Sequence, residues 1–295
     1  MFITTFVSTR EAFAQRSARQ SITVAGVRRT FVLRTPRAPA DSGALRPAVI
    51  VLHGGGGNAE NAEMMTGFSR LVDREGVVVA YPDGSGRART RLLTWNAGEC
   101  CGFAMDERVD DVAFIAALID TLVRGHRVDP RRVYVTGMSN GAMMTHVLAR
   151  ELGTRIAAIA PVVGTIFGVE SPAPVPVPAL IFNGMRDKNV PYDGGPSRGI
   201  GRNAWNSPAQ PARRQGEFWA RANGCDDAPA RDSSGTVVRF VWRCPAGRDV
   251  ELYAITDGGH AWPGGRAGSR VGDTPATEVD ATALMWAFFK AHARN

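Results

Sequence analysis

The sequence predicts an α/β fold, with a mainly parallel central sheet and helices on both of its faces. Short continuous apolar runs, such as Pro47–Leu52 and Val77–Tyr81, are typical of strands that are buried on both sides of a parallel sheet. Segments with helical spacing of apolar residues, such as Val109–Val123, alternate with these runs. A length of 295 residues, with 44% hydrophobic and 21% charged residues, fits one globular domain.

The elements can be placed in chain order. An antiparallel hairpin of Ile22–Val24 and Val27–Arg34 turns at Ala25-Gly26 and is followed by a Pro/Ala/Gly linker, Pro36–Arg46. The later strands are expected at Pro47–Leu52, Val77–Tyr81, Val133–Thr136, Ile156–Val163, Ala179–Asn183, Val237–Trp242 and Val250–Ile255. Helices are expected at Val109–Val123, Asn140–Glu151, Pro211–Ala222 and Glu278–Ala291. In such a sheet the carboxyl ends of the strands carry the binding site, so the loops after residues 52, 136, 183 and 255 should meet.

Charge and hydropathy disfavour two classes of partner. Residues 1–46 carry eight arginines against Glu11 and Asp41, so most of the net charge of +7 is an N-terminal feature, and a nucleic-acid partner is not expected. No stretch approaches the roughly 18 apolar residues of a membrane-spanning helix, so no membrane span is expected. The oligomeric state is left open.

The chain ends and the cysteines bear on where the protein acts. Residues 1–20 are expected to be a flexible segment, a possible signal remnant, and residues 21–295 a single domain. Phe2–Val7 is too short and too polar for a signal core, so either the true start lies upstream or no signal exists. Cys225 and Cys244 are expected to form a local disulfide, with Cys100 and Cys101 bridged to each other or reduced. An even cysteine count favours a secreted or periplasmic protein.

Gly137-Met138-Ser139-Asn140-Gly141 forms the pattern G-x-S-x-G between an expected strand and an expected helix. That context is typical of a nucleophile elbow, in which small residues on either side of the serine permit a sharp turn. Ser139 is therefore the candidate nucleophile, and an ordinary glycine-rich turn is the alternative. The amides at the start of the following helix would face developing negative charge.

A serine hydroxyl needs a base, and the chain offers five histidines. Four fit poorly: His126 lies at the far end of the sheet, His146 is two helical turns beyond the serine, His292 is near the terminus, and His53 is better used structurally. His260, in the glycine-rich loop after the last strand, remains as the base. Asp187, four residues beyond a strand and between the serine and the histidine, is the expected orienting acid, ahead of the competitors Asp193 and Asp257.

His53-Gly54-Gly55-Gly56-Gly57 matches the HGGG type of loop that supplies an oxyanion-hole amide. The amides of Gly55 and Asn140 are the expected pair. Neither G-x-G-x-x-G nor the P-loop pattern fits this run, so nucleotide binding is the weaker hypothesis. With no histidine near the cysteines, no metal site is expected, and no cofactor is expected.

These motifs together resemble those of the single-domain α/β-hydrolase esterases grouped with polyhydroxybutyrate depolymerases and feruloyl esterases. The resemblance spans roughly residues 20–292 and rests on the serine elbow and on further motifs: Leu52-His53-Gly54, Tyr81-Pro82-Asp83-Gly84, Trp95-Asn96, Cys100-Cys101-Gly102, Val109-Asp110-Asp111-Val112, Asn183-Gly184 and Gly258–Gly265. It implies an α/β-hydrolase fold, ester hydrolysis outside the cytoplasm without a cofactor, and the same triad. It also implies that Trp262 lines the substrate pocket, and His53 is placed with it among the substrate-binding residues.

The expected function is a serine carboxyl-ester hydrolase acting on small or oligomeric esters, either of hydroxyalkanoates or of phenolic acids. One alternative is a hydrolase of an anionic polymer such as poly(aspartic acid). It would use a basic segment at 186–214 whose cationic residues are Arg186, Lys188, Arg198, Arg202, Arg213 and Arg214. An acyltransferase is a further possibility, and so is a non-catalytic, hydrolase-like binding protein, which the complete set of three catalytic residue types disfavours.

Overall fold

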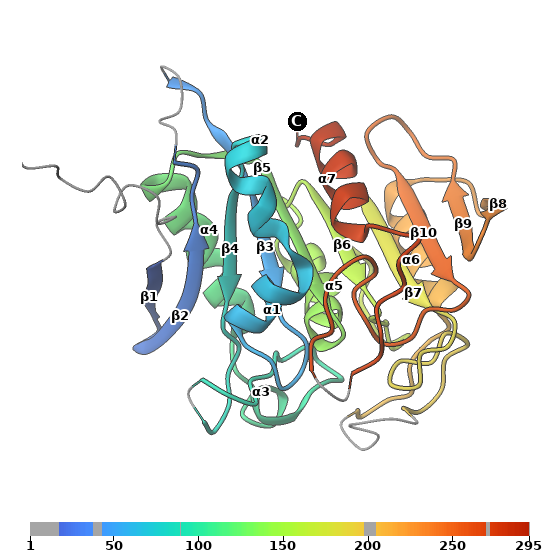
Figure 1. Cartoon of the computed structure of the whole chain (residues 1–295), viewed down its shortest axis with the longest axis horizontal. Coiled ribbons are helices and arrows are strands. Elements are labelled where there is room, and N and C mark those ends of the chain that lie inside the picture. The colour runs from blue at the N-terminus through green and yellow to red at the C-terminus, as the bar shows by residue number, and fades with distance from the viewer. Residues whose placement is uncertain (1–17, 38–42, 89, 198–204, 270–271, 295) are drawn as a thin grey trace, which may run out of the picture.

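A computed structural model of the chain describes residues 18–37, 43–88, 90–197, 205–269 and 272–294. Its centre is one ten-stranded sheet with the order β1-β2-β4-β3-β5-β6-β7-β10-β9-β8 (Figure 1). The six inner strands from β4 to β10 run parallel to one another, and an antiparallel pair closes each edge. The expected mainly parallel sheet is confirmed.

Nine strands correspond to expected ones, with different ends in several cases, and β8 was not expected. Their bounds are β1 Ala18–Val24, β2 Val27–Arg34, β3 Arg46–Leu52, β4 Val78–Pro82, β5 Val128–Met138, β6 Ala158–Val162, β7 Ala179–Gly184, β8 Ala230–Ser234, β9 Val237–Trp242 and β10 Val250–Ile255. β1 begins within the segment expected to be flexible, and residues 1–17 of that segment lie outside the described residues.

Helices cover both faces of the sheet. Their bounds are α1 Ala59–Thr66, α2 Leu71–Glu75, α3 Gly102–Asp106, α4 Asp111–Gly125, α5 Asn140–Glu151, α6 Ala212–Asn223 and α7 Ala281–Ala291, with a 3₁₀ turn at Phe68–Arg70. α4, α5 and α6 contribute to one buried apolar cluster, and α1, α2 and α7 contribute to another on the opposite face. The expectation of helices on both faces is therefore confirmed.

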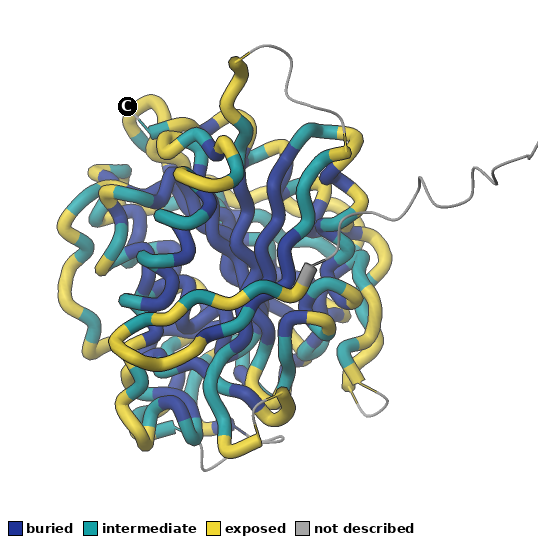
Figure 2. Tube along the Cα trace, turned by 90° about the vertical axis from the view of Figure 1, so that its left-hand side faces the viewer, coloured by how far each residue is buried: buried dark blue, intermediate teal, exposed yellow. Residues whose placement is uncertain are grey.

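β3 shows how the sequence builds this layered core. Side chains alternate across a strand, so Ile50 enters the cluster beneath α4 and α5 while Val49 and Val51 enter the cluster beneath α1 and α7. All three are fully buried, which is why the run is apolar throughout instead of alternating with polar residues. Figure 2 shows these strands as the buried centre of the molecule, with the exposed residues at its periphery.

The expected disulfide between Cys225 and Cys244 is present, and of the two alternatives for Cys100 and Cys101 the structure has the bridge. Cys225 and Cys244 join the segment after α6 to the end of β9, and Cys100 bonds to its neighbour Cys101 in the loop before α3. In the described part of the chain, no helix has the length and apolar character needed to cross a membrane.

Candidate active site

Ser139 stands at the sharp turn between β5 and α5. Its backbone has φ 57° and ψ −122°, a conformation that a non-glycine residue adopts only when the surroundings enforce it. A Cβ on Gly137 would come within 2.5 Å of the Gly141 carbonyl oxygen, and one on Gly141 would overlap the His53 carbonyl oxygen. The two glycines of the G-x-S-x-G pattern are therefore required by close backbone packing.

The three residues expected as a triad form a chain of hydrogen bonds. His260 Nε2 lies 2.9 Å from Ser139 Oγ, and His260 Nδ1 lies 2.7 Å from Asp187 Oδ2. With the carboxylate accepting from Nδ1, Nε2 is left as the acceptor for the serine hydroxyl, which is the tautomer a general base needs. The loops after β5, β7 and β10 supply one residue each, as expected for the carboxyl edge of the sheet.

The Asp187 carboxylate is itself fixed from behind. Its Oδ1 accepts the backbone N–H groups of Asn189 and Val190, both at 2.8 Å, which leaves Oδ2 for the imidazole. The Asp187 side chain is almost completely buried, whereas His260 remains partly exposed at 13%. The histidine can therefore exchange protons with a substrate while the carboxylate that orients it stays shielded from water.

The glycine loop after β3 lies directly against the serine elbow. A Cβ added to Gly54 would be 3.5 Å from Ser139 Cβ, and one added to Gly55 would be 3.6 Å from Asn140 Cβ. Asn140 is the first residue of α5, and the first amides of a helix have no partner within the helix. The structure thus brings Gly55 and Asn140 together beside the nucleophile.

His53 lies under this loop and fixes its shape. The side chain has no exposed surface; its Nε2 accepts the Gly84 N–H at 2.9 Å, and its Nδ1 donates to the Gly54 carbonyl at 2.8 Å. Burial lowers the pKa of His53 to about 4, so the ring stays neutral and keeps one donor and one acceptor. This placement corrects the expectation of a substrate contact, because no atom of the ring is accessible to a substrate.

Trp262 also differs from its expected position. It is fully buried, donates from Nε1 to Thr282 Oγ1 at 3.0 Å, and packs edge-on against Phe68. The side chain thus belongs to the core beneath α1 and α7 and does not line a pocket. It anchors the loop that carries His260, two residues away, from the protein interior.

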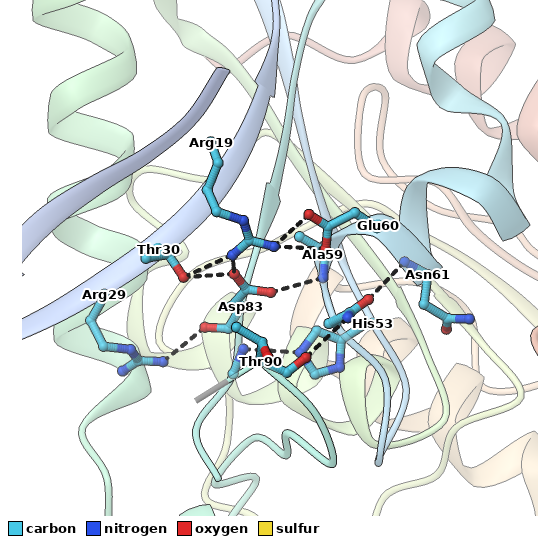
Figure 3. A network of polar contacts seen from close by, with 11 residues as sticks. Arg19, Arg29, Thr30, His53, Ala59, Glu60, Asn61, Asp83 and Thr90 are labelled. Atoms are coloured by element: carbon cyan, nitrogen blue, oxygen red, sulfur yellow. Dashed lines mark hydrogen bonds and ion pairs between the residues drawn. The ribbon is translucent and has the colours of Figure 1, made fainter. Parts of the chain in front are cut away.

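Two buried aspartates hold the loops around the site, and their roles were not predicted. Asp83 accepts the Ala59 N–H at 2.9 Å and the Thr30 hydroxyl at 2.6 Å, and its carboxylate also pairs with Arg19, which reaches Glu60 (Figure 3). These contacts fix the start of α1, the helix that directly follows the glycine loop.

Asp111 holds the loop after β4 in place, as Asp83 holds the start of α1. Its carboxylate pairs with Arg29 at 2.7 Å and accepts the Asn96 N–H at 2.8 Å. Burial raises the pKa of Asp111, although the Arg29 guanidinium beside it acts in the opposite direction. Arg29 also donates to the Asp83 carbonyl oxygen, so one cation joins both supports (Figure 3). The sequence signal for these two roles was the pair of family motifs that contain Asp83 and Asp111.

Of the six cationic residues of the basic segment at 186–214, Arg186 and Lys188 are exposed, and two others share one acidic partner. Arg213 and Arg214 lie on α6 and both pair with Glu217. Arg198 and Arg202 lie outside the described residues. Among the residues that are described, no group of three or more His, Cys, Asp or Glu is arranged to hold a metal ion.

Comparison with known proteins places this geometry in a family. Residues 32–191 match the family described as esterase PHB depolymerase. The chain is 34% identical over 272 residues to a putative esterase, NocK, of Nocardia uniformis subsp. tsuyamanensis, covering 86% of this chain and 76% of that protein. It is 30% identical to feruloyl esterase B of Piromyces equi, covering 75% of this chain but 41% of that protein, so it spans less than half of that relative.

A solved structure shows the same fold. The acetyl xylan esterase from Aspergillus awamori superposes with a TM-score of 0.59 at 16% identity, over 83% of this chain and 94% of that one. The sheet order, the helices on both faces and the serine elbow are those of an α/β-hydrolase. On these matches, the chain belongs to the esterase PHB depolymerase family.

Proposed function

We propose that the protein is a serine carboxyl-ester hydrolase with Ser139 as nucleophile, His260 as general base and Asp187 as orienting acid. The observation that carries this proposal is the continuous hydrogen-bonded chain from Ser139 Oγ through the imidazole to the Asp187 carboxylate. Family membership supports esterase activity, and the geometry supports this mechanism for it.

The reaction would proceed through an acyl-enzyme. His260 Nε2 takes the hydroxyl proton as Ser139 Oγ attacks the ester carbonyl carbon, and then returns that proton to the departing alcohol. Water repeats the sequence on the acyl-enzyme, which releases the acid and restores the serine. The amides of Gly55 and Asn140 would stabilise the oxyanion in both halves, where one such donor typically contributes about 100- to 1,000-fold in rate.

The proposed substrates are esters of hydroxyalkanoate oligomers or of phenolic acids. The family description and the feruloyl esterase relative support this choice. The two disulfides support action in an oxidising compartment, secreted or periplasmic. The anionic-polymer hypothesis has less support, since two of the arginines it would use are paired on α6.

The decisive experiment compares wild type with Ser139→Ala on p-nitrophenyl acetate and butyrate at pH 7 to 8. We expect wild-type hydrolysis and a loss of several orders of magnitude in the variant. Methyl ferulate and 3-hydroxybutyrate oligomers would then separate the two substrate classes, and added alcohol would reveal an acyltransferase. A wild type inert on every ester would contradict the proposal and favour a binding protein or an amidase. A variant that retains its rate would show that Ser139 is not the nucleophile.

A further inference from the structure

A second carboxylate, besides that of Asp187, accepts a hydrogen bond from His260. Asp273 Oδ2 accepts the backbone N–H of His260 at 2.6 Å, whereas Asp187 contacts the imidazole ring. Asp273 is exposed and lies thirteen residues beyond the histidine. A Cβ on Gly259 would overlap the Asp273 carboxylate, so the glycine before the histidine is what allows the carboxylate to approach. The two aspartates therefore fix different parts of the same residue.

Asp273 belongs to the described stretches 264–269 and 272–279, the first of which also contacts α1, the helix that follows the glycine loop. The Arg266 N–H donates to the Met65 carbonyl oxygen at 3.0 Å, and Asn61 Nδ2 donates to the Gly268 carbonyl oxygen at 2.7 Å. A hydrogen bond of 2.8 Å from Gly264 N to Ala276 O joins the two stretches. Residues 264–269 therefore lie beside α1 (Figure 1) and link it to the histidine loop.

Trp262 anchors the histidine loop beyond His260, and Asp273 restrains the main chain at the histidine itself. Gly258 and Gly259 precede His260 directly, and glycines leave the main chain more conformational freedom than any other residue. Contact between Asp187 and the ring fixes the orientation of the imidazole, but not the position of the backbone from which it projects. A bond to the His260 N–H restrains that backbone, and catalytic rates fall steeply when a reacting group is displaced by about 1 Å.

We infer that Asp273 is a positioning residue for the base: its carboxylate holds the His260 main chain so that Nε2 stays within reach of Ser139 Oγ. This inference rests on the proposed function, since it assigns His260 its role. Asp273 acts through an acceptor oxygen on a backbone N–H. Its contribution therefore lies in the acyl-transfer step and not in the binding of the ester.

Steady-state kinetics on p-nitrophenyl butyrate would test this with Asp273→Ala, Asp273→Asn and wild type. We expect Asp273→Ala to lower kcat about 10- to 100-fold with KM within about two-fold, because a displaced base impairs chemistry rather than binding. Asparagine keeps an acceptor oxygen, so Asp273→Asn should recover kcat to within about three-fold of wild type, given that a neutral acceptor forms a weaker bond.

Asp280→Ala is the matched control. Asp280 also accepts a backbone N–H, that of Ala283 at 3.0 Å, but its carboxylate caps α7 and does not bond to His260. We expect it to lower Tm while kcat stays at the wild-type value. The inference is overturned if Asp273→Ala keeps its kcat, if Asp273→Asn fails to recover it, or if Asp280→Ala loses as much. In each case an active wild type and an inactive Ser139→Ala would leave the proposed function standing.

Discussion

Asn140 and Trp95 are joined by two hydrogen bonds that link the serine elbow to the loop after β4. Asn140 Oδ1 accepts the Trp95 N–H at 2.7 Å, and Asn140 Nδ2 donates to the Trp95 carbonyl oxygen at 3.0 Å. The Trp95 indole N–H in turn donates to the His53 carbonyl oxygen at 3.0 Å. The residue after the nucleophile therefore supports, through Trp95, the loop that carries the other expected oxyanion donor.

Replacing Asn140 with alanine should affect both stability and rate. The substitution leaves the buried Trp95 N–H without its partner, which costs about 1–3 kcal/mol, whereas the Trp95 carbonyl oxygen keeps the Ala97 and Cys101 N–H groups. We expect the free energy of unfolding in urea to fall by about 1–3 kcal/mol and kcat/KM to fall with the displaced loop. Asn206→Ala is the control, since Asn206 is exposed and its side chain contacts Met105 Sδ. Equal effects of the two substitutions would refute the link.

Asp187→Asn should impair the base without removing it. The amide presents a donor or a weak acceptor to Nδ1, which favours the wrong imidazole tautomer. We expect kcat to fall about 1,000- to 10,000-fold. Stopped-flow or steady-state hydrolysis of p-nitrophenyl butyrate would measure it. A decrease of only a few-fold would show that another carboxylate, such as Asp193, orients the imidazole.

Gly141→Ala and Gly125→Ala should differ sharply, although both exchange glycine for alanine. At position 141 the new methyl group would overlap the His53 carbonyl oxygen and come within 2.7 Å of the Leu52 carbonyl oxygen, so β3 and the elbow must separate. At position 125, at the end of α4, nothing lies within 4 Å. We expect loss of soluble or active protein for Gly141→Ala and unchanged activity for Gly125→Ala. An active Gly141→Ala enzyme would show that the backbones can separate without loss of the site.

Stability should fall as the pH is lowered from about 6.5 to about 4. Burial lowers the pKa of His53 and of His146 to about 4, so over this range the unfolded chain binds protons that the folded chain does not. Each histidine contributes on the order of 3 kcal/mol to the loss.

Urea unfolding of wild type and His146→Gln at several pH values would measure the effect of one of these histidines. His146 Nε2 bonds to Gln215 and its Nδ1 accepts from Trp219. The variant should be less stable at pH 7 but lose less stability on acidification. Parallel curves for the two proteins would contradict the assignment.

Long apolar segments of the fold were predictable from the sequence, and short or polar ones were not. β8 was missed because all of its residues are exposed and polar or small, so no alternation marks it. β5 begins at Val128, but the prediction began it at Val133. The prediction was too short because Asp129-Pro130 is typical of a turn. α2 and α3 have five residues each, too few to establish a helical period.

The proximity of Ser139, Asp187 and His260 was predictable because chemistry and strand order leave few candidates among five histidines. The supports of the loops were not, since Arg29 and Asp111 are 82 residues apart and only the folded chain brings them together. His53 and Trp262 show a different limit. A motif predicts that a residue lies near the site, but not whether its side chain points toward the substrate or into the core.

The antiparallel pairs at the two edges of the sheet leave β1 and β8 as its outermost strands. Edge strands carry unpaired backbone groups that invite further strands to add. Here the last strands are ARQSITV at one side and ARDSS at the other, each with an arginine, and β8 is exposed along its whole length. Charged, polar borders of this kind disfavour the addition of a strand from another molecule at either edge of the sheet.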